Sequence, residues 1–175
     1  MQQVATDPRV VQQEFSGSDF RHALGSFATG VTVITTRGTD HAYGMTANAF
    51  TSVSLDPPLI LVCVISGTTG AEILQSNECF AVNILGAHQE PISRYFASRK
   101  RPRGLDAFRE IPHTTAVTGS PIIDGVAGFL DCRLHATHEA GDHLIFIGEV
   151  VALAHDPDVE PLVYHGGRYR AVVGE

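Results

Sequence analysis

Apolar and polar positions alternate along most of the chain, a period of two that is typical of β-strands. Helical spacing is confined to three short segments, of which the first follows a candidate N-cap at Ser18 and ends at Gly30. The pattern predicts strands at 31–37, 42–54, 59–65, 79–85, 126–138, 143–155 and within 161–170, and helices after Ser18, in 66–77 and in 89–98.

The predicted strands follow one another along the chain with few helices between them, and the two longest are joined as a hairpin at 139–142. Sequential, hairpin-linked strands favour an antiparallel barrel over a doubly wound sheet. The polar and basic segment 98–112 is predicted to be a long loop. Residues 1–15 are predicted to be an N-terminal tail and residues 16–175 a single domain, because no repeat or linker divides them.

Composition and charge exclude several classes of protein. Hydrophobic residues make up 43% of the 175 residues, which is typical of a folded domain, and the net charge of −7 argues against nucleic-acid or anionic-membrane partners. The longest apolar run is 59–65, too short for a membrane span, and no signal peptide is visible, so we expect a cytoplasmic protein. Three cysteines without a C-x-x-C pattern, Cys63, Cys79 and Cys132, are predicted to be small buried side chains.

Several catalytic motifs are missing from the sequence. It contains no G-x-G of a Rossmann fingerprint, no phosphate-binding P-loop and no G-x-S-x-G nucleophile elbow. Nine histidines are present, but none forms H-E-x-x-H, and His135 and His138 are expected on opposite faces of a strand. We therefore expect no metal site.

The stretch 44–54, "GMTANAFTSVS", carries more polar side chains than a core strand normally tolerates. Hydroxyl and amide groups along one strand suit a flat heteroaromatic ring with hydrogen-bonding edges. The loop 66–70, "SGTTG", combines hydroxyls, glycines and a helix start, which is the composition of an anion site. Ordinary strand formers and an ordinary helix cap would explain the same residues.

Basic residues gather in one short segment of this acidic chain. Arg94, Arg99, Lys100, Arg101 and Arg103 lie within ten residues and would attract a phosphate or pyrophosphate, although a solvated surface would show the same pattern. Together, the polar strand, the loop and the basic cluster indicate a phosphorylated ring ligand bound to a barrel.

Five stretches, "FATGVTVITT", "GMTANAFTSVSLDPPLILVCV", "FAVNIL", "AGDHLIFIGEV" and "PLVYHGGRYR", resemble in this order the short-chain flavin reductases over residues 20–170. The resemblance implies an antiparallel split β-barrel of Greek-key type, a homodimer with flavin near the subunit interface, and NADH or NADPH as the hydride donor. It also implies a flavin-dependent monooxygenase as the partner that receives reduced flavin. FAD is slightly favoured over FMN because the basic segment offers more surface to a pyrophosphate.

By position, the resemblance implies that His143 lies beside the nicotinamide. It implies flavin contacts for Val33, Thr35, Thr36, Thr46, Ala47, Asn48, Ala49, Phe50, Thr51, Ser52, Val53, Asn83, Ile84, Arg168 and Tyr169, and phosphate contacts for Ser66, Thr68 and Thr69. Arg99, Lys100 and Arg101 are suggested as contacts of the adenylate. The chain departs from many relatives in carrying "HGG" before Arg168, where a bulkier residue is common.

Two other functions fit the sequence. One is an oxidase resembling pyridoxamine-phosphate oxidase that retains its flavin, and the other is a non-catalytic flavin- or haem-binding barrel. NADH oxidation with and without added flavin would separate the reductase from the oxidase. A visible spectrum would reveal a bound haem or flavin.

Overall fold

The computed structural model describes residues 15–39 and 41–172, so the predicted tail lies outside the described residues except for Phe15. The helices are α1 (Gly17–Gly25), α2 (Thr69–Asn77), α3 (Glu90–Ala97) and two 3-10 turns, η1 (Ala87–Gln89) and η2 (Gly104–Phe108). The strands are β1 (Thr29–Gly30), β2 (Thr32–Arg37), β3 (Ala42–Ala47), β4 (Phe50–Leu55), β5 (Pro58–Ile65), β6 (Cys79–Ile84), β7 (His113–Thr115), β8 (Pro121–Ile123), β9 (Gly128–Ala140), β10 (His143–His155), β11 (Val163–His165) and β12 (Arg168–Arg170).

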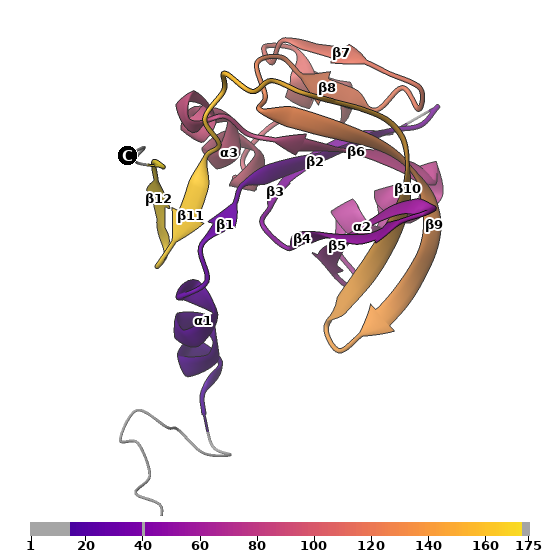
Figure 1. Cartoon of the computed structure of the whole chain (residues 1–175). Helices are drawn as coiled ribbons and strands as arrows, with labels where there is room; N and C mark the ends of the chain where they lie inside the picture. The colour runs from indigo at the N-terminus through magenta and orange to yellow at the C-terminus, as the bar shows by residue number, and fades with distance from the viewer. Residues whose placement is uncertain (1–14, 40, 173–175) are drawn as a thin grey trace, which may run out of the picture.

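Seven strands form one antiparallel sheet in the order β3-β2-β6-β9-β10-β5-β4. Its two edge strands, β3 and β4, are consecutive in the chain and are joined by only Asn48 and Ala49. Because so short a link connects the two edges, the sheet must curl strongly, as Figure 1 shows. The prediction of a mainly β, antiparallel fold with few short helices is confirmed.

Strand β2 is buried on both faces, which explains its unbroken run of β-branched residues. Ile34 belongs to a core inside the curl of the sheet, which Leu74 of α2 completes. Val33, its neighbour on the opposite face, belongs to a second core that Phe96 of α3 and Phe108 of η2 fill. Helices therefore cover both faces of the sheet beside the predicted site.

Local sequence rules account for the elements that border the site. The hydroxyl of Thr68 caps α2 by accepting from the Ala71 amide, and the helix ends at Glu78, which adopts a left-handed φ of 53°. The β9–β10 hairpin turns at Gly141, whose φ of 64° favours glycine. The predicted helix after the 66–70 loop and the predicted hairpin are thus confirmed.

Three predicted elements differ from the structure. The segment 42–54 forms two strands, because the chain crosses from one sheet edge to the other at Asn48 and Ala49. The segment 161–170 forms β11 and β12, which turn at Gly166 and Gly167 with φ of 57° and 77°. The predicted long loop at 98–112 contains η2, whose Phe108 supports the second core.

Helix α1 also has other boundaries than predicted. Ser16, rather than Ser18, is the N-cap, because its hydroxyl accepts from the Asp19 amide while the Asp19 carboxylate accepts from the Ser16 amide. The helix ends at Gly25, whereas Gly30 lies in β1. Figure 1 shows α1 projecting from the sheet, and none of its residues is buried. No helix of the described residues is long and apolar enough to cross a membrane.

The three cysteines are free thiols, but only Cys132 is fully buried, whereas Cys63 and Cys79 are half-buried. Burial, and secondarily the nearby Asp131 carboxylate, raises the pKa of Cys132 from 9.0 to about 12. The prediction of buried thiols therefore holds fully for Cys132 alone. In the described residues, His, Cys, Asp and Glu side chains form no cluster of three suited to a metal ion.

Candidate active site

The predicted ring-binding stretch lies on both edge strands of the curled sheet. We call residues 46–53, which include the end of β3, the two-residue link and the start of β4, the edge ridge. Edge strands leave alternate backbone N–H and C=O groups without partners in the sheet. The ridge therefore presents backbone groups besides its hydroxyls and amide. The exposed residues of the ridge are Asn48, Ala49, Thr51, Ser52 and Val53, and its half-buried residues are Thr46, Ala47 and Phe50.

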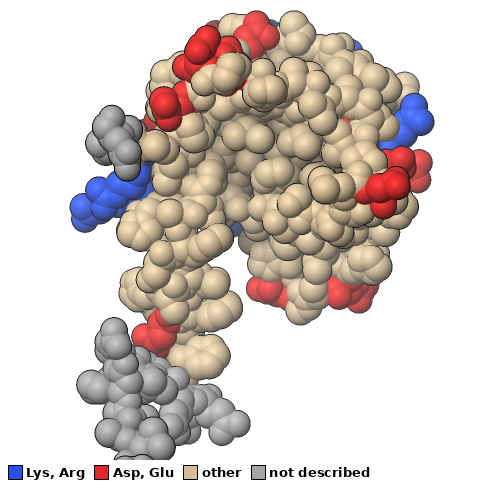
Figure 2. Space-filling model, in the orientation of Figure 1, with Lys and Arg blue, Asp and Glu red and all other residues tan. Residues whose placement is uncertain are grey.

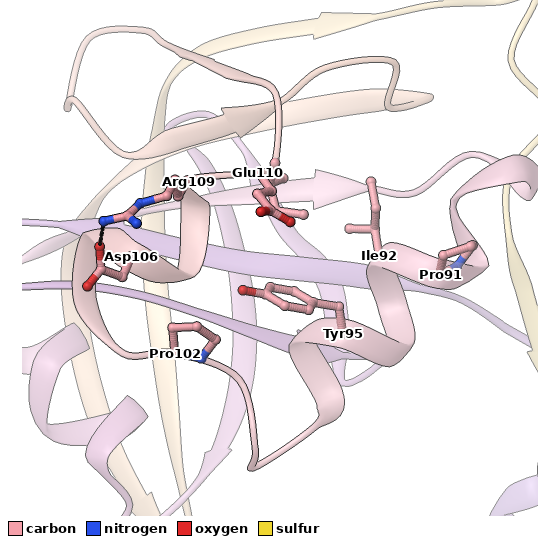
Figure 3. A pocket seen from close by; sticks show the side chains of 8 residues that line it. Pro91, Ile92, Tyr95, Pro102, Asp106, Arg109 and Glu110 are labelled. Carbon is pink, nitrogen blue, oxygen red and sulfur yellow. Dashed lines mark hydrogen bonds and ion pairs between the residues drawn. The ribbon is translucent and has the colours of Figure 1, made fainter.

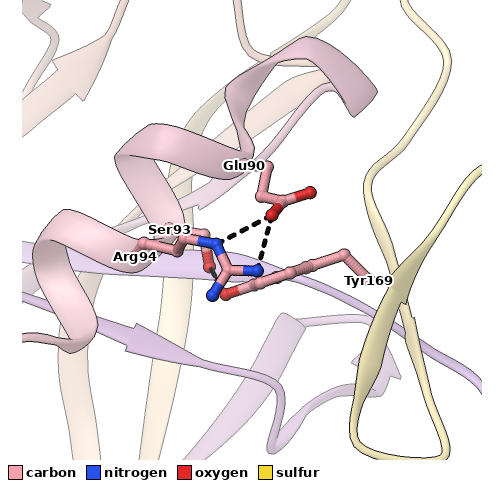
Figure 4. Close-up of polar contacts among 4 residues, drawn as sticks. All are labelled: Glu90, Ser93, Arg94 and Tyr169. Atoms are coloured by element: carbon pink, nitrogen blue, oxygen red, sulfur yellow. Dashed lines mark hydrogen bonds and ion pairs between the residues drawn. The ribbon is translucent and has the colours of Figure 1, made fainter.

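One end of the edge ridge is fastened to α3 and the C-terminal hairpin. The Thr46 hydroxyl donates to the Ser93 carbonyl at 2.6 Å, and the Ser93 hydroxyl bonds the Tyr169 phenol at 2.8 Å. Figure 4 shows Arg94 over the Tyr169 ring, 4.8 Å from its centroid and paired with Glu90 at 2.7 Å. Tyr169 is therefore held beside the ridge, while Arg168 of the same strand is exposed.

A basic cleft of about 410 Å³ opens between the α2 N-terminus and the segment 99–104, and we call it the phosphate cleft. Helix geometry leaves the Thr69 and Gly70 amides without intrahelical acceptors, and the dipole of α2 makes this end positive. The lining residues include three arginines and no Asp or Glu, so the cleft suits an anion. They are Tyr43, Gly44, Gly67, Thr68, Thr69, Arg99, Arg101, Pro102, Arg103, Gly104 and Ala107.

The residues of the phosphate cleft have different tasks. The Thr68 hydroxyl donates to the Ile65 carbonyl at 2.8 Å and caps α2, so its proton is already used. Arg101 donates to the Ser98 and Gly44 carbonyls and lies 5.1 Å from the centroid of the Tyr43 ring. Thr68 and Arg101 therefore shape the cleft, and the exposed Thr69, Arg99 and Arg103 are the polar side chains left for a ligand.

His143 begins β10 directly after the hairpin turn. Its Nδ1 bonds the Asp142 carboxylate at 2.6 Å, and this hydrogen bond holds the pKa of Asp142 below its usual range. The Asp142 carbonyl accepts from the Ser66 amide at 3.0 Å, which ties the turn to the loop that precedes α2. With Nδ1 engaged, Nε2 is the ring nitrogen that can face a ligand.

Strand pairing brings these three regions to the same end of β5. The Ala49 carbonyl accepts from Cys63, so the link of the edge ridge lies beside this residue. Ile65, two positions after Cys63 on β5, pairs with His143 of the neighbouring strand β10. At about 3.3 Å per residue, His143 is displaced by about 7 Å along β5 from Ala49, and β5 lies between the two residues. The phosphate cleft begins two residues after Ile65, at Gly67.

Four of the predicted flavin contacts have side chains that are buried in the structure. Val33, Thr35, Thr36 and Asn83 are at most 1% exposed. The Asn83 amide nitrogen donates to Val33 and Thr35 at 3.0 Å each, and its oxygen accepts from the Ile123 amide at 2.7 Å. The hydroxyls of Thr35 and Thr36 donate to backbone carbonyls of neighbouring strands. These side chains join β2, β6 and β8 and have no free polar group to offer a ligand.

Other predicted residues lie near the site without lining the phosphate cleft. Ile84 packs against the inner core, and the exposed Lys100 and Ser66 are absent from the residues that line the cleft. Tyr43, Gly44 and Arg103 line it but were not among the predicted contacts. The sequence before Met45 has no polar pattern that would have identified Tyr43 as a binding residue. Arg103, in contrast, was part of the basic cluster that was predicted to attract a phosphate.

Another cleft, of about 550 Å³, lies on the outer side of α3 and η2 (Figure 3). It contains none of the predicted site residues. Its one arginine, Arg109, is paired with Asp106 at 2.8 Å, and Glu110 adds a second carboxylate. A phosphorylated ligand would be repelled there, so the phosphate cleft remains the candidate site.

Comparison with known proteins identifies the family of this chain. Residues 24–173 match the family model described as flavin reductase like domain. An NADH-dependent FAD reductase of Streptomyces globisporus is 43% identical over 151 residues, which cover 86% of this chain and 82% of that protein. The chain therefore belongs to the flavin reductase family, as the sequence resemblance predicted.

Solved structures show the same relationship. The Streptomyces globisporus C-1027 NADH:FAD oxidoreductase SgcE6, in complex with NAD and FAD fragments, has a TM-score of 0.82 at 39% identity, covering 89% of this chain and 92% of that one. BorF, the flavin reductase component of a bacterial two-component tryptophan halogenase, has a TM-score of 0.86 at 38% identity, covering 91% of this chain and 100% of that one.

Proposed function

We propose that this protein is an NADH-dependent flavin reductase that transfers a hydride from NADH to FAD or FMN and supplies the reduced flavin to a partner monooxygenase. The observation that carries the proposal is the convergence of the edge ridge, the phosphate cleft and His143 at one end of β5. Relatives named as the reductase subunit HsaB of a flavin-dependent monooxygenase and as the flavin reductase of styrene monooxygenase support the monooxygenase partner.

The edge ridge would hold the isoalloxazine ring. Hydride transfer between nicotinamide and flavin is chemistry that the two cofactors supply themselves. The protein has to stack the rings at about 3–3.5 Å and place donors where negative charge develops. Asn48 and the free backbone groups of the ridge can provide those donors. Tyr169 would border the ring at the fastened end of the ridge.

The phosphate cleft would hold the phosphate of the same flavin. Tyr43 and Thr46 are three residues apart on β3, about 10 Å, a distance that a ribityl phosphate chain can span. The amides of Thr69 and Gly70, the Thr69 hydroxyl and the Arg99 guanidinium would bind the phosphate oxygens. Gly67, with a φ of 67° and no atom within 4 Å of its Cβ position, keeps the approach open.

His143 would position the nicotinamide without donating a proton to the reaction. Its Nδ1 hydrogen bond to Asp142 orients the ring and leaves Nε2 toward the ligand. A hydride moves without any proton from the protein, so the residue serves binding geometry.

A second copy of the chain would close the site, because the edge ridge is open in a single subunit and lines neither of the two clefts described above. The outer face of β5 and β10 beside the ridge carries a group of apolar side chains, whereas the solvent face of an antiparallel sheet is normally polar. Figure 2 shows charged side chains at the rim of this view, with few at its centre. Half-buried or exposed residues of that face are Leu61, Cys63, Ile65, Ile145 and Ile147.

Helix α1 offers a second apolar surface to the same partner. Phe20, Leu24 and Phe27 are 53%, 57% and 76% exposed, although they follow the spacing of a buried face. A homodimer that buries α1 and the outer sheet face would remove both surfaces from water. We accordingly infer a homodimer of split barrels, in which the link between β3 and β4 lies near the subunit interface.

A steady-state matrix of NADH and NADPH against FAD, FMN and riboflavin tests the reductase function. We expect rapid NADH oxidation only when free flavin is added. Turnover that does not depend on added flavin would favour a flavin-retaining oxidase, and no turnover with any pair would refute the proposal.

Sedimentation tests the homodimer separately. We expect a dimer for the wild type and dissociation for Leu24→Glu, because a charge would enter the apolar surface of α1. His22→Glu on the same helix is the control for added negative charge, since the exposed His22 lies on the side of the helix opposite Leu24. A fully active monomer at micromolar concentration would contradict the proposed dimer.

A further inference from the structure

A second cleft of about 430 Å³ adjoins the phosphate cleft, and we call it the α2 cleft. The two share Tyr43, Thr69, Arg103 and Gly104 as lining residues, so they meet at a common border. Each lies within the range of about 300–1,000 Å³ that is usual for small-molecule sites. A ligand with its phosphate in the first cleft can therefore continue into the second.

One face of helix α2 lines the α2 cleft. Thr69, Glu72, Ile73 and Ser76 follow the i, i+3, i+4, i+7 spacing of a single helix face, and all four line the cleft. Glu72 and Ser76 are exposed and one turn apart, so their oxygens lie close together. This face combines an apolar contact, Ile73, with a carboxylate and a hydroxyl.

Charge differs between the two clefts. Arginine residues dominate the phosphate cleft, whereas the α2 cleft has the Glu72 carboxylate within it and Arg103 at the border. A carboxylate repels phosphate but accepts hydrogen bonds from hydroxyl and amino groups. The α2 cleft therefore suits a nucleoside, and Arg103 suits a second phosphate placed between that nucleoside and the first phosphate.

Tyr43 provides a fixed aromatic surface at the border. Its ring lies next to Gly70, where the position of an added Cβ would be only 2.9 Å from Tyr43 Cε1. Arg101 lies 5.1 Å from the ring centroid and is itself held by backbone carbonyls. The ring is therefore anchored by the helix and by Arg101, and it lines both clefts.

We propose that the α2 cleft binds the adenosine monophosphate half of FAD, with Arg103 on the second phosphate and Glu72 and Ser76 on the ribose or adenine, so that the protein selects FAD over FMN. The inference rests on the proposed function, because it takes the flavin phosphate to lie in the phosphate cleft. FMN ends at that phosphate and would leave the α2 cleft without a ligand.

Flavin binding without NADH tests this inference independently of turnover. Fluorescence titration should give a higher affinity for FAD than for FMN, by about tenfold or more if a charged hydrogen bond and a nucleoside contact are gained. Glu72→Gln and Arg103→Gln should each lower the ratio of FAD to FMN affinity by about five- to tenfold. Arg133→Gln, an exposed arginine of β9 outside both clefts, should keep the wild-type ratio and controls for the loss of a positive charge.

Adenosine 5′-monophosphate is the direct probe of the α2 cleft. It should displace FAD and leave FMN binding unaffected, and Glu72→Gln should weaken that displacement. Equal affinities for FAD and FMN, or no effect of the nucleotide on FAD, would overturn the inference. Competition with NADH alone would also overturn it, because the cleft would then serve the nicotinamide dinucleotide. NADH-dependent reduction of FMN in any of these cases would leave the proposed reductase function standing.

Discussion

Two polar regions of this protein carry the same residue types and have opposite environments. Asn83 of β6, with Thr35 and Thr36 of β2, is fully buried, and its side-chain hydrogen bonds join three strands. Asn48, with Thr51 and Ser52, is exposed on the edge ridge, where Asn48 makes one 3.3 Å bond to Thr29. The comparison shows that threonine and asparagine in a strand indicate either internal bracing or a binding surface, depending on what covers that face.

The largest expected effect separates the two asparagines by stability. Asn83→Leu keeps the volume but leaves the Ile123 amide and the Val33 carbonyl without this partner, so the free energy of unfolding should fall by about 2–4 kcal/mol. Asn48→Leu should change it by less than about 0.5 kcal/mol, because the residue is exposed. Urea denaturation of both variants measures the difference.

Flavin affinity should show the reverse order for the same pair. Asn48→Leu should weaken flavin binding by about 0.5–1.5 kcal/mol, the value of one neutral hydrogen bond. Folded Asn83→Leu protein should bind flavin nearly as well as the wild type. Similar losses of stability in both variants would show that the edge ridge is also a structural brace.

A second pair of variants separates the helix-capping role of Thr68 from the proposed ligand-binding role of Thr69 at the N-terminus of α2. Thr69→Val should weaken FMN binding by about 1.5–3 kcal/mol, the value of a hydrogen bond to a charged group, without altering stability. Thr68→Val should lower the free energy of unfolding by about 1 kcal/mol, because it removes the N-cap. Titration with FMN and riboflavin, together with urea denaturation, measures both. An equal effect of Thr69→Val on riboflavin would place the phosphate elsewhere.

The interior also responds to pH in a way that the edge ridge does not. Because the pKa of Cys132 is raised from 9.0 to about 12, the native thiol keeps its proton between these values while the unfolded chain loses it. Stability from this group is therefore complete below pH 9 and declines above it, by roughly 1 kcal/mol at pH 10. Denaturation at pH 8 and pH 10 should show this extra decline in the wild type and in Cys63→Ala. In Cys132→Ala it should be missing, and its persistence there would assign the decline to another group.

The smallest expected effect concerns His143, which we place beside the nicotinamide rather than the flavin. His143→Ala should raise the Michaelis constant for NADH by about 2–12-fold, equivalent to one neutral hydrogen bond, with little change in flavin affinity. His143→Asn retains a donor and should recover part of the loss. Loss of turnover at saturating NADH would instead identify the residue as an essential proton donor.

Much of the architecture could be predicted from the sequence. Period-two alternation, β-branched runs and turn glycines placed most of the strands, and the hydroxyl-rich loop 66–70 correctly preceded a capped helix. Local chemistry determined these features, because each depends on residues that are close in the chain. Where a long-range connection decided the boundary, as at Asn48 and Ala49, the single predicted strand was wrong.

The sequence by itself determined that this chain is a mainly antiparallel β-protein with a polar strand and a hydroxyl- and glycine-rich loop that leads into a helix. Only the tertiary structure decided which polar side chains can contact a ligand. Alternation shows that a strand has two faces, but packing covers both faces of β2. The face with Thr35, and Asn83 of β6 beside it, lies under α3, η2 and β8, whereas α2 covers the face with Thr36. The same packing places Tyr43, Thr69 and Arg103 around one cleft, since residues distant in sequence meet only when the sheet has curled and its helices have docked.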